Sequence, residues 1–338
     1  MKQDTQKAGW KKWSLPVRIG IAAGACWLVA RELNWEELKS AFLDLNLWVL
    51  ALAAIVYTAE QGFLGFRWWL LLRAQRIAVP LRLAVKLNYL GLFFSSFLPS
   101  SVGGDLVRAW HVSRHSSRKL QAAFGVFVDR VVGLFATLII AFAAILLFMR
   151  DTPFFRIQLV QQQLQRLRHI SGPHVLLVLL IILGAGLVLH RPLEALTGRT
   201  YRYLKHLLGQ LHQVLAVYYR HPFVLVTTIM LTIVLQSLVI LVYWLVGVSL
   251  NIDATVGYYF VFFPVVWVVG SIPISIAGIG ILEGGIVFLF VRYTGATTEA
   301  AAALALCQRL TWLAASLPGL VFHLTGSHRR AQTNTTPA

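Results

Sequence analysis

The chain has 338 residues, of which 58% are hydrophobic and 13% charged, and its formal net charge is +17. A soluble domain needs roughly a quarter of its residues charged, so this composition excludes a soluble globular protein. The basic residues lie mainly between long apolar runs, which favours an anionic phospholipid surface over nucleic acid as the electrostatic partner. The sequence therefore predicts an all-α polytopic membrane protein.

Eight apolar runs follow one another along the chain, and several exceed the ~20 residues that cross a bilayer core. The first follows a basic tail at 1–14 and lacks a convincing cleavage site, so we expect a retained signal-anchor helix. We expect a single transmembrane domain over 15–325, with about 8 transmembrane segments, and a polar tail at 326–338. The runs cover residues 15–30, 47–66, 87–104, 124–149, 174–190, 223–250, 256–291 and 300–324.

The distribution of Lys and Arg between the loops predicts the orientation. With the N-terminus in the cytoplasm, 21 of the 30 basic residues fall on the cytoplasmic side and 6 on the opposite side. Both termini are therefore expected inside. A segment near 199–220 alternates apolar and basic residues at helical spacing, and we interpret it as an amphipathic connecting helix on the cytoplasmic leaflet.

Two segments do not fit as single crossings. Segment 87–105 should start and finish inside, and segment 256–291 should start and finish outside, so each is either a pair of short crossings or a re-entrant hairpin. Each contains a Pro, then Gly residues, then an acid: Pro99 to Asp105, and Pro273 to Glu283. Interrupted segments at matching places in two halves are typical of inverted-repeat transporters with a mid-membrane site.

These breaks have two interpretations. They can form a polar cavity in which backbone N–H groups at half-helix starts face an anionic headgroup. Alternatively, Pro and Gly can simply kink or closely pack membrane helices. The occurrence of the motif twice, in opposite orientations and each time with an acid, favours the cavity.

Ionisable residues within or beside the runs are expected to face the interior and pair, because a charge at the bilayer centre costs about 2.5–3.5 kcal/mol. Asp105 and Arg108 are spaced to pair within one helix. Glu283 and Arg309 are expected either to pair with each other or to contact a headgroup or proton. For Arg67, Arg108, Asp129 and Arg130, snorkelling to the interface is an equal alternative. Glu60 and Arg67 lie two turns apart on one helix face.

Motifs of soluble enzymes are absent from the sequence. There is no phosphate-binding loop, no Gly-x-Ser-x-Gly elbow and no Asp-x-Asp cluster, and His111 and His115 lack the Glu of a zincin helix. Cys26 and Cys307 both lie in apolar stretches and are expected to act as small hydrophobes. We expect no cofactor, no metal and no catalytic residue.

Two strings and one residue pair resemble a known family. The strings are LPSSVGGDLVRAW, from Leu98 to Trp110, and IPISIAGIGILEGG, from Ile272 to Gly285; the pair is Asp129-Arg130. Together they resemble the lysylphosphatidylglycerol synthase transmembrane-domain, or flippase-like, family, and the likeness covers nearly the whole chain. The chain has Asp129-Arg130 where the family commonly has Glu-Arg, and Ala277 where a polar residue or Gly is frequent.

The resemblance implies translocation of a polar-headed lipid between leaflets. In the best understood members this region accompanies an aminoacyl-transferase domain; none follows the last run here, so we expect a stand-alone member that does not synthesise the lipid. The expected headgroup cavity comprises Pro99, Ser100, Gly103, Gly104, Asp105, Arg108, Asp129, Arg130, Pro273, Ser275, Gly278, Gly280, Glu283 and Arg309.

The leading hypothesis is a flippase of the bacterial cytoplasmic membrane for a phospholipid or isoprenoid lipid. The alternatives are a membrane-embedded transferase and a non-catalytic partner in lipid or glycan biosynthesis. Membrane lipids are the expected partners; lipid-biosynthesis enzymes and a second copy of the chain are left open.

Overall fold

A computed structural model describes residues 34–43, 45–97, 103–114, 119–148, 218, 222–271 and 278–325. All secondary structure in these ranges is helical, in agreement with the predicted fold class. The predicted signal anchor, the run at 174–190, both tails and the amphipathic segment apart from Tyr218 lie outside the described residues. The helices are α2 (Trp35–Leu43), α3 (Leu47–Ala74), α4 (Leu81–Phe97), α5 (Gly103–Arg114), α6 (Lys119–Phe148), α10 (Pro222–Ser249), α11 (Val256–Gly270), α12 (Ile281–Thr294) and α13 (Thr298–Leu324).

Four of the described helices, α3, α6, α10 and α13, are long and apolar enough to cross a membrane. Local signals mark where they begin. The Asn46 side chain accepts a hydrogen bond from the Trp48 amide, and the Thr297 hydroxyl accepts one from the Ala300 amide, as N-caps do. Pro222 occupies the first position of α10, where its missing N–H is not needed.

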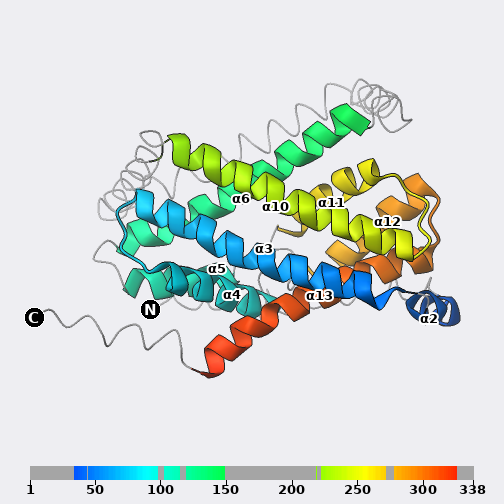
Figure 1. The fold of residues 1–338 in the computed structure, drawn as a ribbon, viewed down its shortest axis with the longest axis horizontal. Helices are drawn as coiled ribbons and strands as arrows, with labels where there is room; N and C mark the ends of the chain where they lie inside the picture. The colour runs from blue at the N-terminus through cyan, green and yellow to red at the C-terminus, as the bar shows by residue number, and fades with distance from the viewer. Residues whose placement is uncertain are drawn as a thin grey trace, which may run out of the picture.

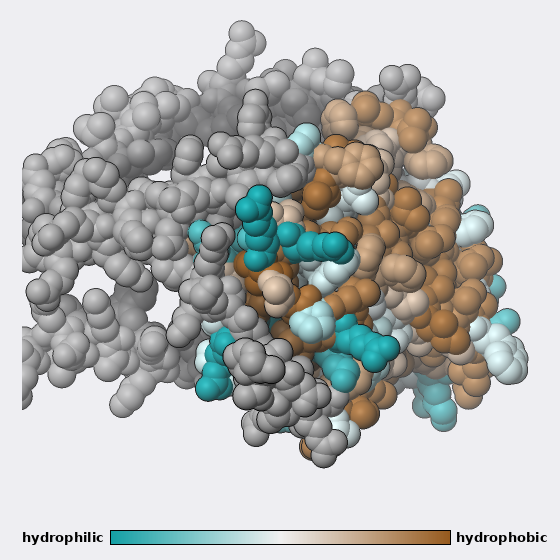
Figure 2. All heavy atoms as spheres, turned by 60° about the vertical axis from the view of Figure 1, so that its left-hand side comes forward, coloured by the Kyte–Doolittle hydropathy of each residue, from teal (hydrophilic) through white to brown (hydrophobic). Residues whose placement is uncertain are grey.

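The exposed side chains of these helices are largely apolar, and Figure 2 shows apolar side chains gathered over the described part of one face of the molecule. On α10 the exposed side chains Val226, Met230, Val234, Leu238, Leu241, Leu245 and Val248 recur every three or four residues. That spacing forms one stripe along the helix, which suits lipid rather than water.

Four shorter helices form two antiparallel pairs, the α4–α5 hairpin and the α11–α12 hairpin. In Figure 1, α4–α5 lies beside the half of α3 that ends at Ala74, and α11–α12 lies beside the half of α10 that ends at Ser249. Residues 98–102 and 272–277, which contain the predicted prolines, lie outside the described residues. The longest of the four helices has 17 residues, or about 26 Å at 1.5 Å per residue.

Gly104 allows α5 to return closely along α4. A Cβ at this position would collide with the Gly91 carbonyl oxygen and the Ser95 hydroxyl. In the other hairpin, Gly278 and Gly280 have φ of 72° and 81°, which glycine adopts at no steric cost, and the chain turns there into α12.

The apolar core is divided into two main clusters. One joins the end of α3 to the α4–α5 hairpin and the start of α6, and it includes Trp68, Leu87 and Val126. The other joins α10, the α11–α12 hairpin and the start of α13, and it includes Tyr243 and Phe290. The segments of α3 and α6 between these clusters carry polar residues, and this level of the bundle holds the candidate site.

Candidate functional site

A cavity of about 340 Å³ lies between the two hairpins. Each long helix contributes residues from near its midpoint: Glu60 and Gln61 from α3, Gly133 and Thr137 from α6, Gln236 from α10, and Gln308 from α13. The facing ends of the hairpins complete the wall with Ser95, Asp105, Arg108, Trp267, Ser271 and Leu282. The cavity is therefore halfway along all four candidate membrane spans.

Part of the cavity wall is an ion pair between α3 and α6. Arg67 donates from Nε to Oδ1 of Asp129 at 2.9 Å, and its Nη2 lies 2.8 Å from the same oxygen. Its Nη1 donates to the Thr232 hydroxyl of α10 at 2.9 Å. Both members of the pair are buried, so three long helices are tied together at the level of the cavity.

Arg108 extends this pair toward the hairpin end. Its Nη2 donates to Oδ2 of Asp129 at 3.0 Å, and its Nη1 lies 3.5 Å from Asp105 Oδ1, which confirms the spacing-based Asp105–Arg108 pair. The guanidinium also stacks 4.3 Å above the Trp68 ring. Arg108 thus joins α5 to α6 through Asp129 and contacts Asp105 within its own helix.

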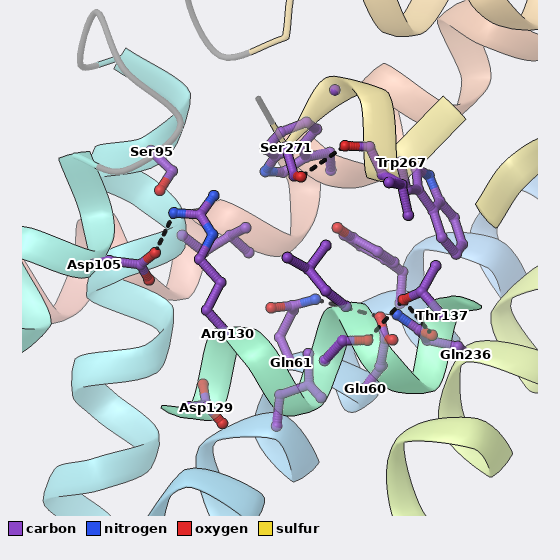
Figure 3. A pocket seen from close by; sticks show the side chains of 18 of the residues that line it. Glu60, Gln61, Ser95, Asp105, Asp129, Arg130, Thr137, Gln236, Trp267 and Ser271 are labelled. Carbon is purple, nitrogen blue, oxygen red and sulfur yellow. Dashed lines mark hydrogen bonds and ion pairs between the residues drawn. The ribbon is translucent and has the colours of Figure 1, made fainter. Parts of the chain in front are cut away.

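The network ends at its two most exposed charged side chains, Arg130 and Asp105. Arg130 donates from Nη1 to Oδ2 of Asp105 at 2.6 Å, and the two side chains are 27% and 24% exposed. Figure 3 shows this pair beside Ser95 on one side of the cavity. Arg67, Arg108 and Asp129 are buried and paired inside the bundle, so interfacial snorkelling, the alternative considered for them, is wrong.

The opposite side of the cavity carries a second polar group. Figure 3 shows Glu60, Gln61, Thr137 and Gln236 gathered there. The Thr137 hydroxyl lies 3.0 Å from Gln236 Oε1. Gln61 donates from Nε2 to Glu60 at 3.3 Å. The cavity therefore has guanidinium groups at one end and an amide-lined carboxylate at the other.

Glu283 and Arg309 form a separate pair. Arg309 donates from Nε to Oε1 of Glu283 at 2.7 Å and stacks 4.9 Å from the Trp312 ring, while the other Glu283 oxygen accepts the Gly280 amide at 2.8 Å. Of the two possibilities considered for these residues, the structure shows the mutual pair. Leu282 and Trp312 line the cavity, whereas Glu283 and Arg309 are not among its described lining residues.

The predicted site residues therefore separate into three groups. Asp105, Arg108, Asp129 and Arg130 line the cavity. A second group does not line the cavity in the described structure: Gly103, Gly104, Gly278, Gly280 and Glu283 follow the breaks, and Arg309 of α13 pairs with Glu283. A third lies outside the described residues: Pro99, Ser100, Pro273 and Ser275.

Several lining residues were missing from the predicted set. The predicted site leaves out Glu60 and Arg67, although both are ionisable, and Gln236, although its placement resembles the family's; it also leaves out Gln61 and Thr137. A polar side chain inside a long apolar run is the signal that finds all of them except Arg67, which directly follows such a run. In the described ranges no group of three or more His, Cys, Asp or Glu side chains could hold a metal ion.

Comparison with known families agrees with this architecture. The sequence profile described as Lysylphosphatidylglycerol synthase TM region matches residues 16–319. The chain belongs to this family. As a member of the lysylphosphatidylglycerol synthase TM region family, with apolar helices of spanning length, it is a multi-pass membrane protein associated with lipid-related processes. A search of curated proteins returned no match.

Proposed function

We propose that the protein is a flippase, which moves a polar-headed lipid across the bacterial cytoplasmic membrane. The observation that carries this proposal is the polar cavity halfway along four candidate spans, at the level where the two apolar clusters separate. A headgroup needs such a polar site to cross the hydrocarbon core, while its acyl chains can remain against the apolar outer stripes.

In this proposal the α4–α5 and α11–α12 hairpins are re-entrant and related by an inverted repeat. Their helices have 12 to 17 residues, fewer than the roughly 20 that cross a bilayer. Irregular backbone between such helices is tolerated at membrane depth when it is buried in protein or lines a wet cavity. The excess of basic residues on one side supports cytoplasmic termini, with the α4–α5 hairpin entering from the cytoplasm.

The chemistry of the cavity supports a phosphate-bearing headgroup. Among the described lining residues, Arg130 offers the most exposed guanidinium, and a guanidinium matches phosphate oxygens in a bidentate geometry. Asp105, which also lines the cavity, accepts a hydrogen bond from Arg130. We therefore assign headgroup contact to Arg130 and Asp105, support of that contact to Arg108 and Asp129, and positioning of the second hairpin to Glu283 and Arg309.

A reconstituted assay tests the proposal. Purified full-length protein in phosphatidylcholine vesicles with tail-labelled fluorescent phosphatidylglycerol should expose inner-leaflet label to a membrane-impermeant quencher, whereas protein-free vesicles should not. Arg130→Ala should slow this movement by about tenfold, because a charge-assisted hydrogen bond is worth about 1.5–3 kcal/mol. Arg114→Ala removes an exposed arginine from the far end of α5 and is the matched control, with an unchanged rate expected.

Protection of the inner-leaflet label in vesicles that contain folded protein would contradict the flippase proposal. A membrane-embedded transferase or a non-catalytic partner of a biosynthetic enzyme would then be the better hypothesis.

A further inference from the structure

Glu60 differs from the other charged residues of the cavity. Three carboxylates and three guanidinium groups line the cavity among the described residues, and five of these six groups form the continuous network from Arg67 to Arg130. Glu60 is the sixth. It is only 5% exposed, and no cation in the described part of the chain lies within ion-pair distance of it.

The groups facing Glu60 do not neutralise a full negative charge. From α3 itself, Arg67 attracts it but is held by Asp129, and Tyr57 is a neutral phenol. The other helices packed around this level of α3 present Tyr243 from α10, Asp129 and Arg130 from α6, Arg309 from α13, and Tyr89 from α4. Each of these arginines has its own carboxylate, and the Tyr89 hydroxyl donates to the Thr58 carbonyl.

A buried carboxylate without a paired cation is strongly destabilised when ionised, and proton uptake relieves the destabilisation. Glu60 lines the cavity, so water that enters the cavity can bring a proton to it. We propose that Glu60 is the proton-binding site of the cavity and that it couples movement of the anionic headgroup to a proton in the same direction.

The coupling follows from charge balance, and it rests on the proposed function. With Glu60 ionised, the three carboxylates and three guanidinium groups balance. A headgroup carrying one negative charge then adds an unbalanced charge in a region of low dielectric, unless Glu60 takes up a proton. Headgroup binding therefore raises the proton affinity of Glu60, and protonation equally tightens headgroup binding, because such linkage is reciprocal. One proton and one monoanionic headgroup cross together without net charge.

Proton binding can be tested without any transport. Difference infrared spectroscopy of the purified full-length protein, titrated with pH, should show a protonated-carboxyl band that is lost as the pH rises. The band should be missing in Glu60→Gln and present in Glu36→Gln, which removes an exposed carboxylate from α2. A spectrum of Glu60→Gln identical to that of the native protein would overturn the proposal, whether or not the protein moves lipid.

Coupling is tested in the vesicles with labelled phosphatidylglycerol under an imposed pH gradient. A one-unit gradient with the acidic side outside should sustain an inner-to-outer label ratio of about tenfold, and a protonophore should abolish it. Glu60→Asp should keep this response. Glu60→Gln should move the label without responding to the gradient.

Label movement by the native protein that ignores the gradient would overturn the coupling while leaving the flippase proposal intact. Absence of movement alongside a normal infrared titration would overturn the flippase proposal and the coupling built on it, but not the assignment of Glu60 as the proton site.

Discussion

The two hairpins share a sequence motif and an antiparallel geometry, yet their acids lie in different environments. Asp105, after the first break, faces the cavity and contacts arginines from α5 and α6. Glu283, after the second break, accepts the amide of Gly280 at the start of its own helix, pairs with Arg309 and is not among the described lining residues. In the proposed function, similar backbone arrangements thus serve a binding role in one hairpin and a positioning role in the other. An acid that follows a Pro/Gly break is not by itself evidence of a binding site.

The largest expected difference concerns the stability of the charge networks. Asp129→Ala leaves the guanidinium groups of Arg67 and Arg108 buried without their shared carboxylate, and breaking a buried pair in this way costs about 3–5 kcal/mol. Glu283→Ala leaves a single guanidinium group, that of Arg309, without its carboxylate. The Arg309 side chain is 17% exposed, so the loss of stability should be about 1–3 kcal/mol. Unfolding of the two variants in detergent, followed by circular dichroism, measures both values. Equal losses would contradict the proposed difference between the networks.

A second comparison tests how tightly each hairpin is packed. Gly104→Ala would force α5 away from the α4 backbone, and overpacking of this kind costs about 1–3 kcal/mol. Gly285→Ala in α12 places its methyl 3.1 Å from a Val266 side-chain carbon, which can shift slightly, so a loss of under about 1 kcal/mol is expected. The same unfolding experiment compares the two variants. A larger loss of stability for Gly285→Ala would show that the α11–α12 hairpin is the more tightly packed one.

A third comparison separates binding from positioning. Asp105→Asn removes the counterion of Arg130, so the anionic headgroup should bind more tightly and leave more slowly, lowering the maximal lipid transport rate by about tenfold. Glu283→Gln should lower the unfolding temperature but keep the rate of the folded fraction within about twofold. Initial transport rates, measured against the mole fraction of labelled lipid, give the apparent headgroup affinity and the maximal rate of each variant. A loss of rate confined to Glu283→Gln would place the binding role in the second hairpin instead.

Much of the fold follows from the apolar runs. The runs at 223–250 and 300–324 closely match α10 and α13, because long uninterrupted apolar segments leave little choice of structure. The predicted run at 47–66 is shorter than the helix, because Arg67 interrupts the apolar pattern. In the structure α3 continues to Ala74, with Arg67 buried. Arg82 and Lys86 interrupt the apolar pattern in the same way, so the predicted run starts at residue 87 although α4 starts at Leu81.

The site was less predictable than the fold. The Asp105–Arg108 contact lies within one helix and could be derived from spacing. The partners of Arg67 and Arg130 come from helices distant in sequence, and only tertiary packing determines them. Helical spacing placed Glu60 and Arg67 on one face, but Arg67 bonds to Asp129 and leaves Glu60 without an ion-pair partner in the described structure.

The central claim is that the facing ends of the two hairpins border a hydrated cavity inside the membrane. Single cysteines at Ser95 and at Ser271, introduced with Cys26 and Cys307 replaced by alanine, test it most directly in intact vesicles. Both should react with a small, charged, membrane-impermeant thiol reagent, while a cysteine at the outward-facing Leu238 of α10 should not. Protection of both Ser95 and Ser271 positions to the same degree as Leu238 would show a sealed bundle and contradict the account.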